Sequence, residues 1–242
     1  MTFDEYVECR VYHLLIQSIY NNELYNPFFK LIRQKNIPII DFLTIIRENS
    51  SRAPESFRNF LEAFIKDTKG ELWDDYDELN DYCKKEENYE KLCAGKMGHN
   101  LLQTYGAIAT KMFSEWNEYI FSMFKELLNY NEISEENQKM LHDVNNFCVN
   151  RVHNIWGSDR SKNNPKSNFT YNIAEWMRTS RGANIEEFKF NKPTDVEFKY
   201  TEQQNKDIDD WLERYGNTPT GIGRILVKIN SASWVLRQPH IT

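Results

Sequence analysis

The chain has 242 residues, of which 40% are hydrophobic, 14% aromatic and 27% charged. This composition excludes an intrinsically disordered chain and predicts a folded protein with a core of ordinary size. The formal net charge is −6 and the isoelectric point is near 5.5. A nucleic-acid binder is expected to carry a basic stripe, so the charge argues against nucleic acid as a partner.

The amino-terminal region carries Asp4, Glu5 and Glu8 where a secretory signal would place positive charge. No apolar run approaches the roughly 18 residues needed to cross a bilayer. The four cysteines are sparse and share no disulfide-like spacing, as expected of reduced thiols. We therefore expect a cytoplasmic protein without a membrane partner.

The first 70 residues have the pattern of consecutive amphipathic helices. Thr2 and Glu5 form a capping box, which predicts a helix from about residue 3 to Tyr20. Three more helices are expected, each started by a proline: Pro27, Pro38 and Pro54. Apolar side chains at i, i+3, i+4 and i+7 in these segments predict buried stripes, so the helices should pack as a bundle-like array.

Residues 71–90 are strongly acidic, with nine aspartates and glutamates. Trp73, Tyr76, Leu79 and Cys83 lie between them at roughly helical spacing. We interpret the segment as a solvated acidic face over an aromatic seam. A carboxylate metal site is the weaker reading, because its ligands would normally come from several elements.

The strongest helical periodicity runs from Leu101 to Leu128. It predicts one helix of roughly 40 Å against which the shorter helices pack. Ser134 is expected to cap another helix, which carries His142, Cys148 and His153. Those three side chains are too far apart along one helix to share a metal ion.

The amino-acid composition changes after Trp156. Residues 157–168 are expected to be a polar loop, and residues 169–242 a small α+β region. Within it we expect a short helix over 173–179, a β-hairpin with strands 185–190 and 196–200, and a helix from Thr201 to Gly216. The predicted fold is therefore mainly α, with a helical domain over 1–156, one long central helix, and the α+β region packed on it.

No segment carries a catalytic signature, so we assign no catalytic or metal-binding residue. The glycines before the long helix fit a turn better than a phosphate loop, with Asn100 near the cap. The alternative is that His99 is a polar group that faces a cleft. Gly221 and Gly223 lack a preceding strand, so we interpret them as a chain reversal after Pro219.

Four further side chains are candidates for contact with an anionic or aromatic ligand: Trp176, Arg178, Arg181 and Arg224. A guanidinium can donate two parallel hydrogen bonds to a carboxylate or phosphate, and an indole ring can stack on an aromatic or cationic ligand. Salt bridges to Glu186 or Glu187 are the structural alternative for these arginines.

Three segments together resemble the carboxy-terminal region of cobalamin (B12)-binding radical SAM proteins, over nearly the whole chain. They are Phe3-Asp4-Glu5-Tyr6 with the helix that follows, the block from Asn88 to Leu128, and the stretch from Tyr215 to Leu226. In that family an amino-terminal cobalamin domain and a radical SAM barrel perform the chemistry. The resemblance implies that the carboxy-terminal part covers the barrel and helps to shape its substrate side.

The chain lacks both cofactor motifs of that family, the Cys-x-x-x-Cys-x-x-Cys cluster loop and the Asp-x-His-x-x-Gly cobalamin motif. We therefore expect a non-catalytic accessory region. An iron–sulfur cluster, S-adenosylmethionine and cobalamin would come only from radical SAM and B12 domains, in cis or in trans. Two alternatives stay open: a self-contained helical interaction module that uses its acidic face, and an enzyme whose site combines His99, Trp176 and Arg178.

Overall fold

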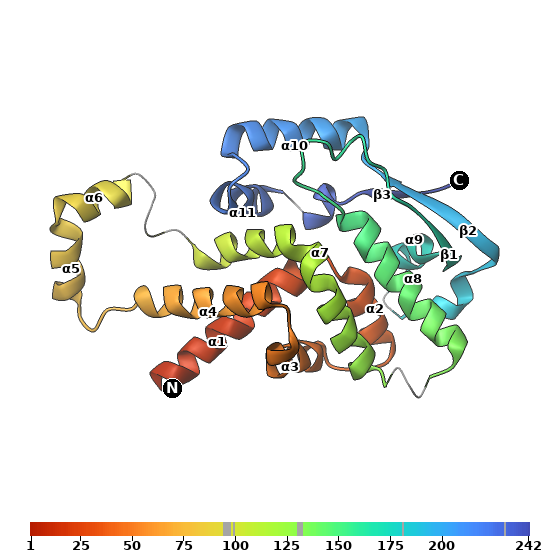
Figure 1. Ribbon diagram of the computed structural model, residues 1–242, viewed down its shortest axis with the longest axis horizontal. Coiled ribbons are helices and arrows are strands. Elements are labelled where there is room, and N and C mark those ends of the chain that lie inside the picture. The colour runs from red at the N-terminus through yellow and green to blue at the C-terminus, as the bar shows by residue number, and fades with distance from the viewer. Residues whose placement is uncertain (94–97, 99, 130–132, 181, 230) are drawn as a thin grey trace.

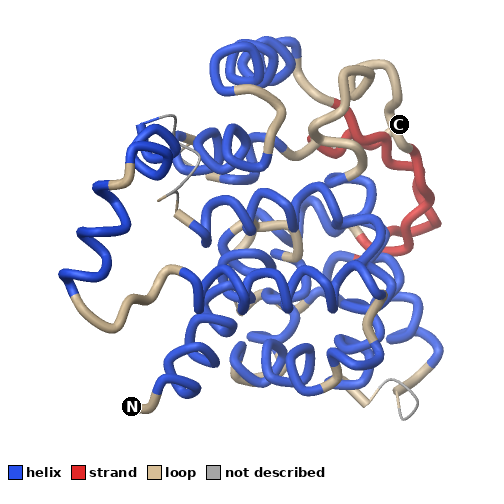
Figure 2. The backbone as a smooth tube through the Cα atoms, turned by 60° about the vertical axis from the view of Figure 1, so that its left-hand side comes forward, coloured by secondary structure: helices blue, strands red, loops and turns tan. Residues whose placement is uncertain are grey.

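The computed structural model describes residues 1–93, 98, 100–129, 133–180, 182–229 and 231–242 (Figure 1). The predicted fold class is confirmed: helices dominate, and a small antiparallel sheet lies near the carboxyl terminus (Figure 2). The helices are α1 (Phe3–Leu15), α2 (Asn26–Gln34), α3 (Ile39–Glu48), α4 (Glu55–Gly70), α5 (Tyr76–Lys84), α6 (Glu86–Cys93), α7 (Leu101–Leu127), α8 (Glu135–Val152), α9 (Ile173–Arg178), α10 (Glu202–Tyr215) and α11 (Pro219–Lys228). The strands are β1 (Lys166–Tyr171), β2 (Lys189–Lys199) and β3 (Gln238–Ile241).

The long helix α7 is the centre of the fold, as predicted. It packs against α1, α3, α4, α8 and α11. Its buried face is aromatic: the ring of Phe124 stacks on Phe28 of α2 with centroids 4.1 Å apart, and Trp116 meets Phe57 of α4 edge-on at 5.1 Å. Because such rings bury large apolar areas, α7 joins the amino-terminal helices into one core.

The predicted first helix is confirmed, with one irregularity. Its chain is α-helical to Leu15 and continues as a π-helix over Ile16–Asn21. The buried Asn22 follows, and its side-chain amide donates to the carbonyl of Gly106 in α7 at 2.8 Å. This bond fixes the end of the π-helix against the middle of the fold.

The predicted hairpin over residues 185–200 is wrong. Residues 185–188 form a short 3₁₀ turn, and β2 runs without a turn through Pro193. Proline is tolerated there because it lies between the pairs Thr194–Phe169 and Lys189–Tyr171, where the β1–β2 register shifts. Strand β2 pairs with β1 on one side and with β3 on the other.

The predicted chain reversal at Gly221 and Gly223 is also wrong. Both residues are helical, and Pro219 begins α11, which Thr218 caps through a hydrogen bond from the amide of Gly221 at 3.1 Å. A Cβ at Gly221 would overlap the carbonyl oxygens of Tyr215 and Gly216. The glycines therefore allow α11 to fit between the end of α10 and the side of α7.

A fully buried arginine joins the carboxyl terminus to the rest of the chain. The guanidinium of Arg237 donates to the carbonyl oxygens of His153, of Arg160 at 3.1 Å and of Asn163 at 3.3 Å, and lies over the Tyr200 ring at 4.8 Å. Side chains of residues 1–156 and of the carboxy-terminal part enter one continuous core. Strand β1 begins at Lys166, within the segment predicted as a polar loop.

Candidate functional site

The sequence-predicted ligand contacts are dispersed over the fold. His99 and Arg181 lie outside the described residues. Asn100 caps α7, where its side-chain oxygen accepts from the amide of Gln103 at 3.2 Å. Figure 1 shows the amino end of α7 well apart from α9, which carries Trp176 and Arg178.

The side chains on α9 and α11 have structural surroundings. Trp176 is fully buried, and its indole donates to the carbonyl of Ala183 at 2.9 Å, so it offers no open stacking face. Arg178 is exposed and pairs with Glu175 of the same helix at 3.3 Å, not with Glu186 or Glu187. Arg224 is exposed on α11.

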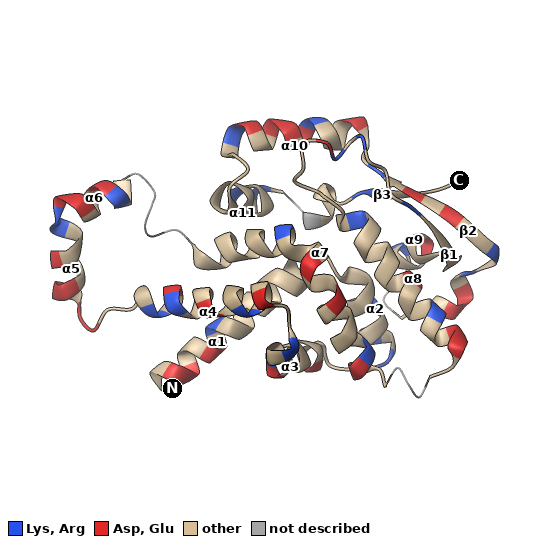
Figure 3. Ribbon diagram, viewed as in Figure 1, with Lys and Arg blue, Asp and Glu red and all other residues tan. Residues whose placement is uncertain are grey.

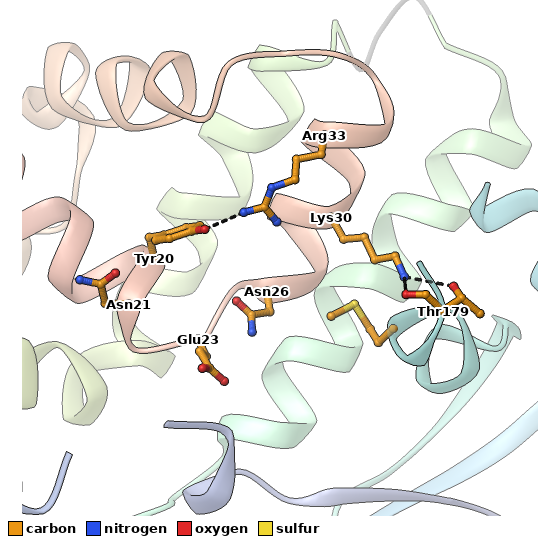
Figure 4. A pocket seen from close by; sticks show the side chains of 8 residues that line it. Tyr20, Asn21, Glu23, Asn26, Lys30, Arg33 and Thr179 are labelled. Atoms are coloured by element: carbon orange, nitrogen blue, oxygen red, sulfur yellow. Dashed lines mark hydrogen bonds between the residues drawn. The ribbon is translucent and has the colours of Figure 1, made fainter. Parts of the chain in front are cut away.

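A pocket of about 350 Å³ lies between the π-helix, α2 and the end of α9 (Figure 4). Its lining residues are Tyr20, Asn21, Glu23, Asn26, Lys30, Arg33, Met177 and Thr179. The volume is within the range of small-molecule sites, about 300–1,000 Å³. The chain following Trp176 therefore does border a polar pocket, but through side chains that the sequence did not single out.

The pocket rim contains two backbone irregularities. Tyr20 and Asn21 belong to the π-helix, a conformation that is rare and frequent at functional sites. Glu23 follows with φ of 58°, in the left-handed region that non-glycine residues seldom adopt. Such strain persists only where surrounding contacts enforce it. Here Ser231 and Ser233 bond the Glu23 carboxylate, and the neighbouring Asn22 amide donates to Gly106.

Lys30 forms one wall of the pocket and is almost fully buried. Its ammonium donates to the carbonyls of Trp176 and Thr179 and to the Thr179 hydroxyl, the latter two at 3.1 and 3.2 Å. Burial lowers the pKa of Lys30. Because an ammonium has three donors, all of them are used to hold the end of α9 against α2.

Arg33 and Glu23 carry the opposite charges of the pocket. The Arg33 guanidinium donates to the Tyr20 hydroxyl at 2.6 Å and lies over that ring at 5.6 Å. Glu23 accepts from the Ser231 hydroxyl at 2.8 Å and from the Ser233 amide at 3.1 Å. Within the described part of the chain, neither charge has an oppositely charged partner within 4 Å.

This pocket was not predicted, although the sequence contains a signal for it. Asn21, Asn22 and Glu23 interrupt two apolar helices, and Lys30 and Arg33 are three residues apart, hence on one face of α2. When the other side chains of a helix are buried, a polar face on that helix indicates that this face borders a polar site and not the apolar core. What the sequence could not show is that α9, some 140 positions further on, closes the pocket.

A second feature is the arm, residues 71–93, which contains α5 and α6. The two helices pack on each other and stand to one side of the body (Figure 1). The predicted aromatic seam is wrong: Tyr76 and Leu79 are exposed and no side chain of α5 is buried. Trp73 instead meets Tyr82, which the prediction did not include, with ring centroids 4.8 Å apart. Outside that contact, Tyr76 is 76% exposed and Tyr89 58%.

All nine acidic side chains of residues 71–90 are exposed. Figure 3 shows acidic positions in red along α5 and α6. Only Lys84 and Lys85 oppose them in that segment, which gives a charge of 2 − 9 = −7. The arm therefore combines an acidic field with exposed aromatic rings.

No protein-family model, curated protein or solved structure matches this chain. The relation to cobalamin-binding radical SAM proteins thus stays a prediction from the residues quoted above. Across the described parts of the chain, no helix is both long and apolar enough to cross a membrane. The same residues contain no group of three or more His, Cys, Asp or Glu side chains placed to hold a metal ion.

Proposed function

We propose that this chain is a non-catalytic accessory region that covers the substrate side of a cobalamin-binding radical SAM enzyme. The radical SAM and cobalamin domains would be supplied in cis or in trans. The observation that carries this proposal is the position of the three resembling segments. Phe3–Tyr6 begin α1, the block 88–128 contains α7, and 215–226 span the end of α10 and most of α11; both α1 and α11 pack on α7.

Segments far apart in sequence thus share one core. Three segments that resembled the family by chance would not be expected to lie next to one another, whereas three parts of one fold pattern would. Gly223 within the third segment lies directly against Gln103 within the second, so the residues that carry the resemblance also form the contact. This adjacency supports the treatment of the three segments as a single family pattern.

The chain's own side chains do not fit an iron–sulfur cluster. Cys9, Cys83, Cys93 and Cys148 lie on four different helices, and Cys148 is buried. Burial raises the pKa of the Cys148 thiol well above its usual range, which disfavours the thiolate that ligates iron. The accessory role therefore requires that the cluster belong to another domain or subunit.

The arm is the surface we assign to contact with that domain. Its charge of −7 over residues 71–90 is complementary to a basic surface, and the exposed rings of Tyr76 and Tyr89 add apolar area. The same observation favours a second candidate function, a helical interaction module that binds a basic partner unrelated to radical SAM chemistry.

The proposal is tested by co-expression of this chain with a protein or domain that carries the Cys-x-x-x-Cys-x-x-Cys loop, encoded next to it. We expect a complex that co-purifies with iron–sulfur absorbance. A complex that forms but lacks that absorbance after reconstitution counts against the accessory role.

Charge reversal in the arm tests the contact surface. Asp74→Lys, Asp75→Lys and Asp77→Lys together should abolish co-purification, because all three side chains are exposed on the arm. Asp75 also caps α5 by accepting from the Glu78 amide at 2.8 Å, so a lower stability of the arm is expected while the circular dichroism spectrum of the body is kept. The matched control reverses three exposed acids elsewhere, Glu118, Asp210 and Glu213. If both triple variants lose binding equally, the contact depends on overall charge and not on the arm.

The two candidate functions give different results in this experiment. Loss of binding to the cluster-loop protein in the arm variant supports the accessory role. If instead the chain ignores that protein but its arm binds a basic protein without a cluster loop, the interaction module is the correct function.

A further inference from the structure

The pocket between the π-helix, α2 and α9 has features that core packing does not require. A π-helix, a glutamate with a left-handed backbone conformation and two cationic side chains border one cavity (Figure 4). Strained backbone costs stability and is frequent where a ligand uses it. Neither Arg33 nor Glu23 forms an ion pair within 4 Å among the described residues, although Glu23 also lies in the field of the partly buried Arg151. The charges and donors of these groups set the class of ligand that the pocket can bind.

Lys30 is not available to a ligand. Its three donors are used by the oxygen atoms of Trp176 and Thr179 at the end of α9. It contributes positive potential to the pocket and fixes the wall from which Met177 and Thr179 face the cavity.

Arg33 is available. A guanidinium has five N–H donors, and the Tyr20 hydroxyl accepts from one nitrogen only. The Tyr20 ring and hydroxyl together hold the guanidinium in one orientation, half-buried at the pocket edge. A planar fork fixed in this way matches a carboxylate, to which it can donate two parallel hydrogen bonds.

Glu23 supplies the opposite charge. The Ser231 hydroxyl lies within hydrogen-bond distance of both carboxylate oxygens and the Ser233 amide donates to Oε2, which fixes the orientation of the carboxylate and leaves a lone pair of Oε1 for a further donor. Figure 4 shows Arg33 and Glu23 on different sides of the pocket with Asn26 between them. A carboxylate held there matches an ammonium group.

The two charges together decide the ligand class. A simple anion would be attracted by Arg33 and Lys30 but repelled by Glu23, and a simple cation would meet the reverse. A molecule with both an ammonium and a carboxylate satisfies both sides. We propose that this pocket binds a free α-amino acid, with its carboxylate on Arg33, its ammonium on Glu23, and the amides of Asn21 and Asn26 as further polar contacts.

The test needs only the purified chain, so its outcome is independent of the radical SAM proposal. The twenty standard amino acids are added one at a time and binding is followed by NMR chemical shifts and thermal melting. We expect at least one to bind with a Kd below about 10 mM. Its N-acetyl form, which lacks the ammonium, and its primary amide, which lacks the carboxylate, should each bind at least tenfold more weakly, about 1.4 kcal/mol.

Variants test the two side chains separately. Glu23→Gln retains the size and an acceptor for Ser231, and Arg33→Gln removes the fork; each should weaken binding of that amino acid at least tenfold. Arg224→Gln, an exposed arginine on α11, is the matched control and should bind as the unaltered chain does. The unliganded melting temperatures check that every variant folds.

Two results would overturn the proposal. One is that no amino acid binds the folded chain at about 10 mM. The other is that the N-acetyl form or the amide binds as tightly as the free amino acid. Both measurements use the unaltered protein, so they decide the matter even if a variant does not fold.

Discussion

A Cβ atom on Gly223 would lie 2.8 Å from the carbonyl oxygen of Gln103. The backbone of α11 therefore approaches the backbone of α7 more closely than any side chain permits. Gly223→Ala would have to push α11 away from α7, because backbone cannot rotate aside as a side chain does. We expect the free energy of unfolding to fall by about 1–3 kcal/mol, measured by urea denaturation.

Gly70→Ala is the matched control for this substitution. Gly70 is the last residue of α4, and a Cβ there would have no atom within 4 Å. We expect no loss, and a gain of up to about 1 kcal/mol because alanine restricts the unfolded chain. Equal losses in the two variants would mean that the α7–α11 contact is not specially close.

Asn22 and Asn21 give a second matched pair. Asn22 is buried and donates to the carbonyl of Gly106, whereas Asn21 is exposed and donates to the side chain of Gln17 at 3.3 Å. Asn22→Ala removes this bond to a carbonyl within α7 and also removes the side-chain oxygen that accepts from Gln17 at 3.1 Å, so we expect a loss of about 1–3 kcal/mol. Asn21→Ala should stay within about 0.5 kcal/mol.

The Asn22 result also bears on the backbone around the pocket. If the bond to Gly106 holds the π-helix in place, Asn22→Ala should increase amide hydrogen exchange over Ile16–Asn21. Unchanged exchange together with unchanged stability would show that other contacts hold the π-helix.

Local rules predicted the helices well, because their signals lie within each segment. The capping box of Thr2 and Glu5 forms as expected, with the Glu5 carboxylate accepting from the Thr2 amide at 2.6 Å. Ser134 caps α8, and Gly216 ends α10 with a φ of 80°. Each of these helix ends depends on a few neighbouring residues, so it can be predicted from the sequence alone.

The errors arose where tertiary contacts override local preference. Gly221 and Gly223 have turn propensity, but their use is close packing against other elements, which the sequence does not encode locally. Pro193 marks a register shift within a strand and not a turn, because β1 and β3 hold both ends of β2. The pocket was missed for the same reason: its cations come from α2, its carboxylate from Glu23 before that helix, and α9 completes it.

Arg237 and Arg178 carry the same charge in opposite settings. Arg237 is fully buried and donates to three carbonyls, while Arg178 is exposed beside Glu175. Arg237→Lys replaces a fork with a single ammonium that cannot reach all three acceptors. We expect a loss of about 2–3 kcal/mol in the free energy of unfolding.

Arg178→Lys should change stability by less than about 1 kcal/mol, since exposed ion pairs contribute little. Circular dichroism melts of both variants compare the two sites directly. A similar small effect at both positions would contradict the assignment of Arg237 as the residue that joins the carboxyl terminus to the core.

The aspartates Asp143 and Asp195 should respond to pH with opposite signs. Burial raises the pKa of Asp143, and the backbone amides of Tyr171 and Thr170 offset only part of that rise. At Asp195, hydrogen bonds from Asn168 and Lys166 lower the pKa. Each shift is relative to an ordinary value of 3.8.

The sign of each effect follows from which state holds the proton more tightly. With a raised pKa, the folded chain binds the proton better, so the stabilisation at Asp143 is complete below 3.8 and is lost as the pH rises through the folded value. With a lowered pKa, the stabilisation at Asp195 is present above 3.8 and is lost as the pH falls through the folded value. The test is urea denaturation at a series of pH values from acid to neutral. As the pH rises, the free energy of unfolding of Asp143→Asn should increase relative to that of the unaltered protein, and that of Asp195→Asn should decrease relative to it. Slopes of the same sign for both variants would mean that burial does not control Asp143, and that the two amides of β1 dominate its charge state instead.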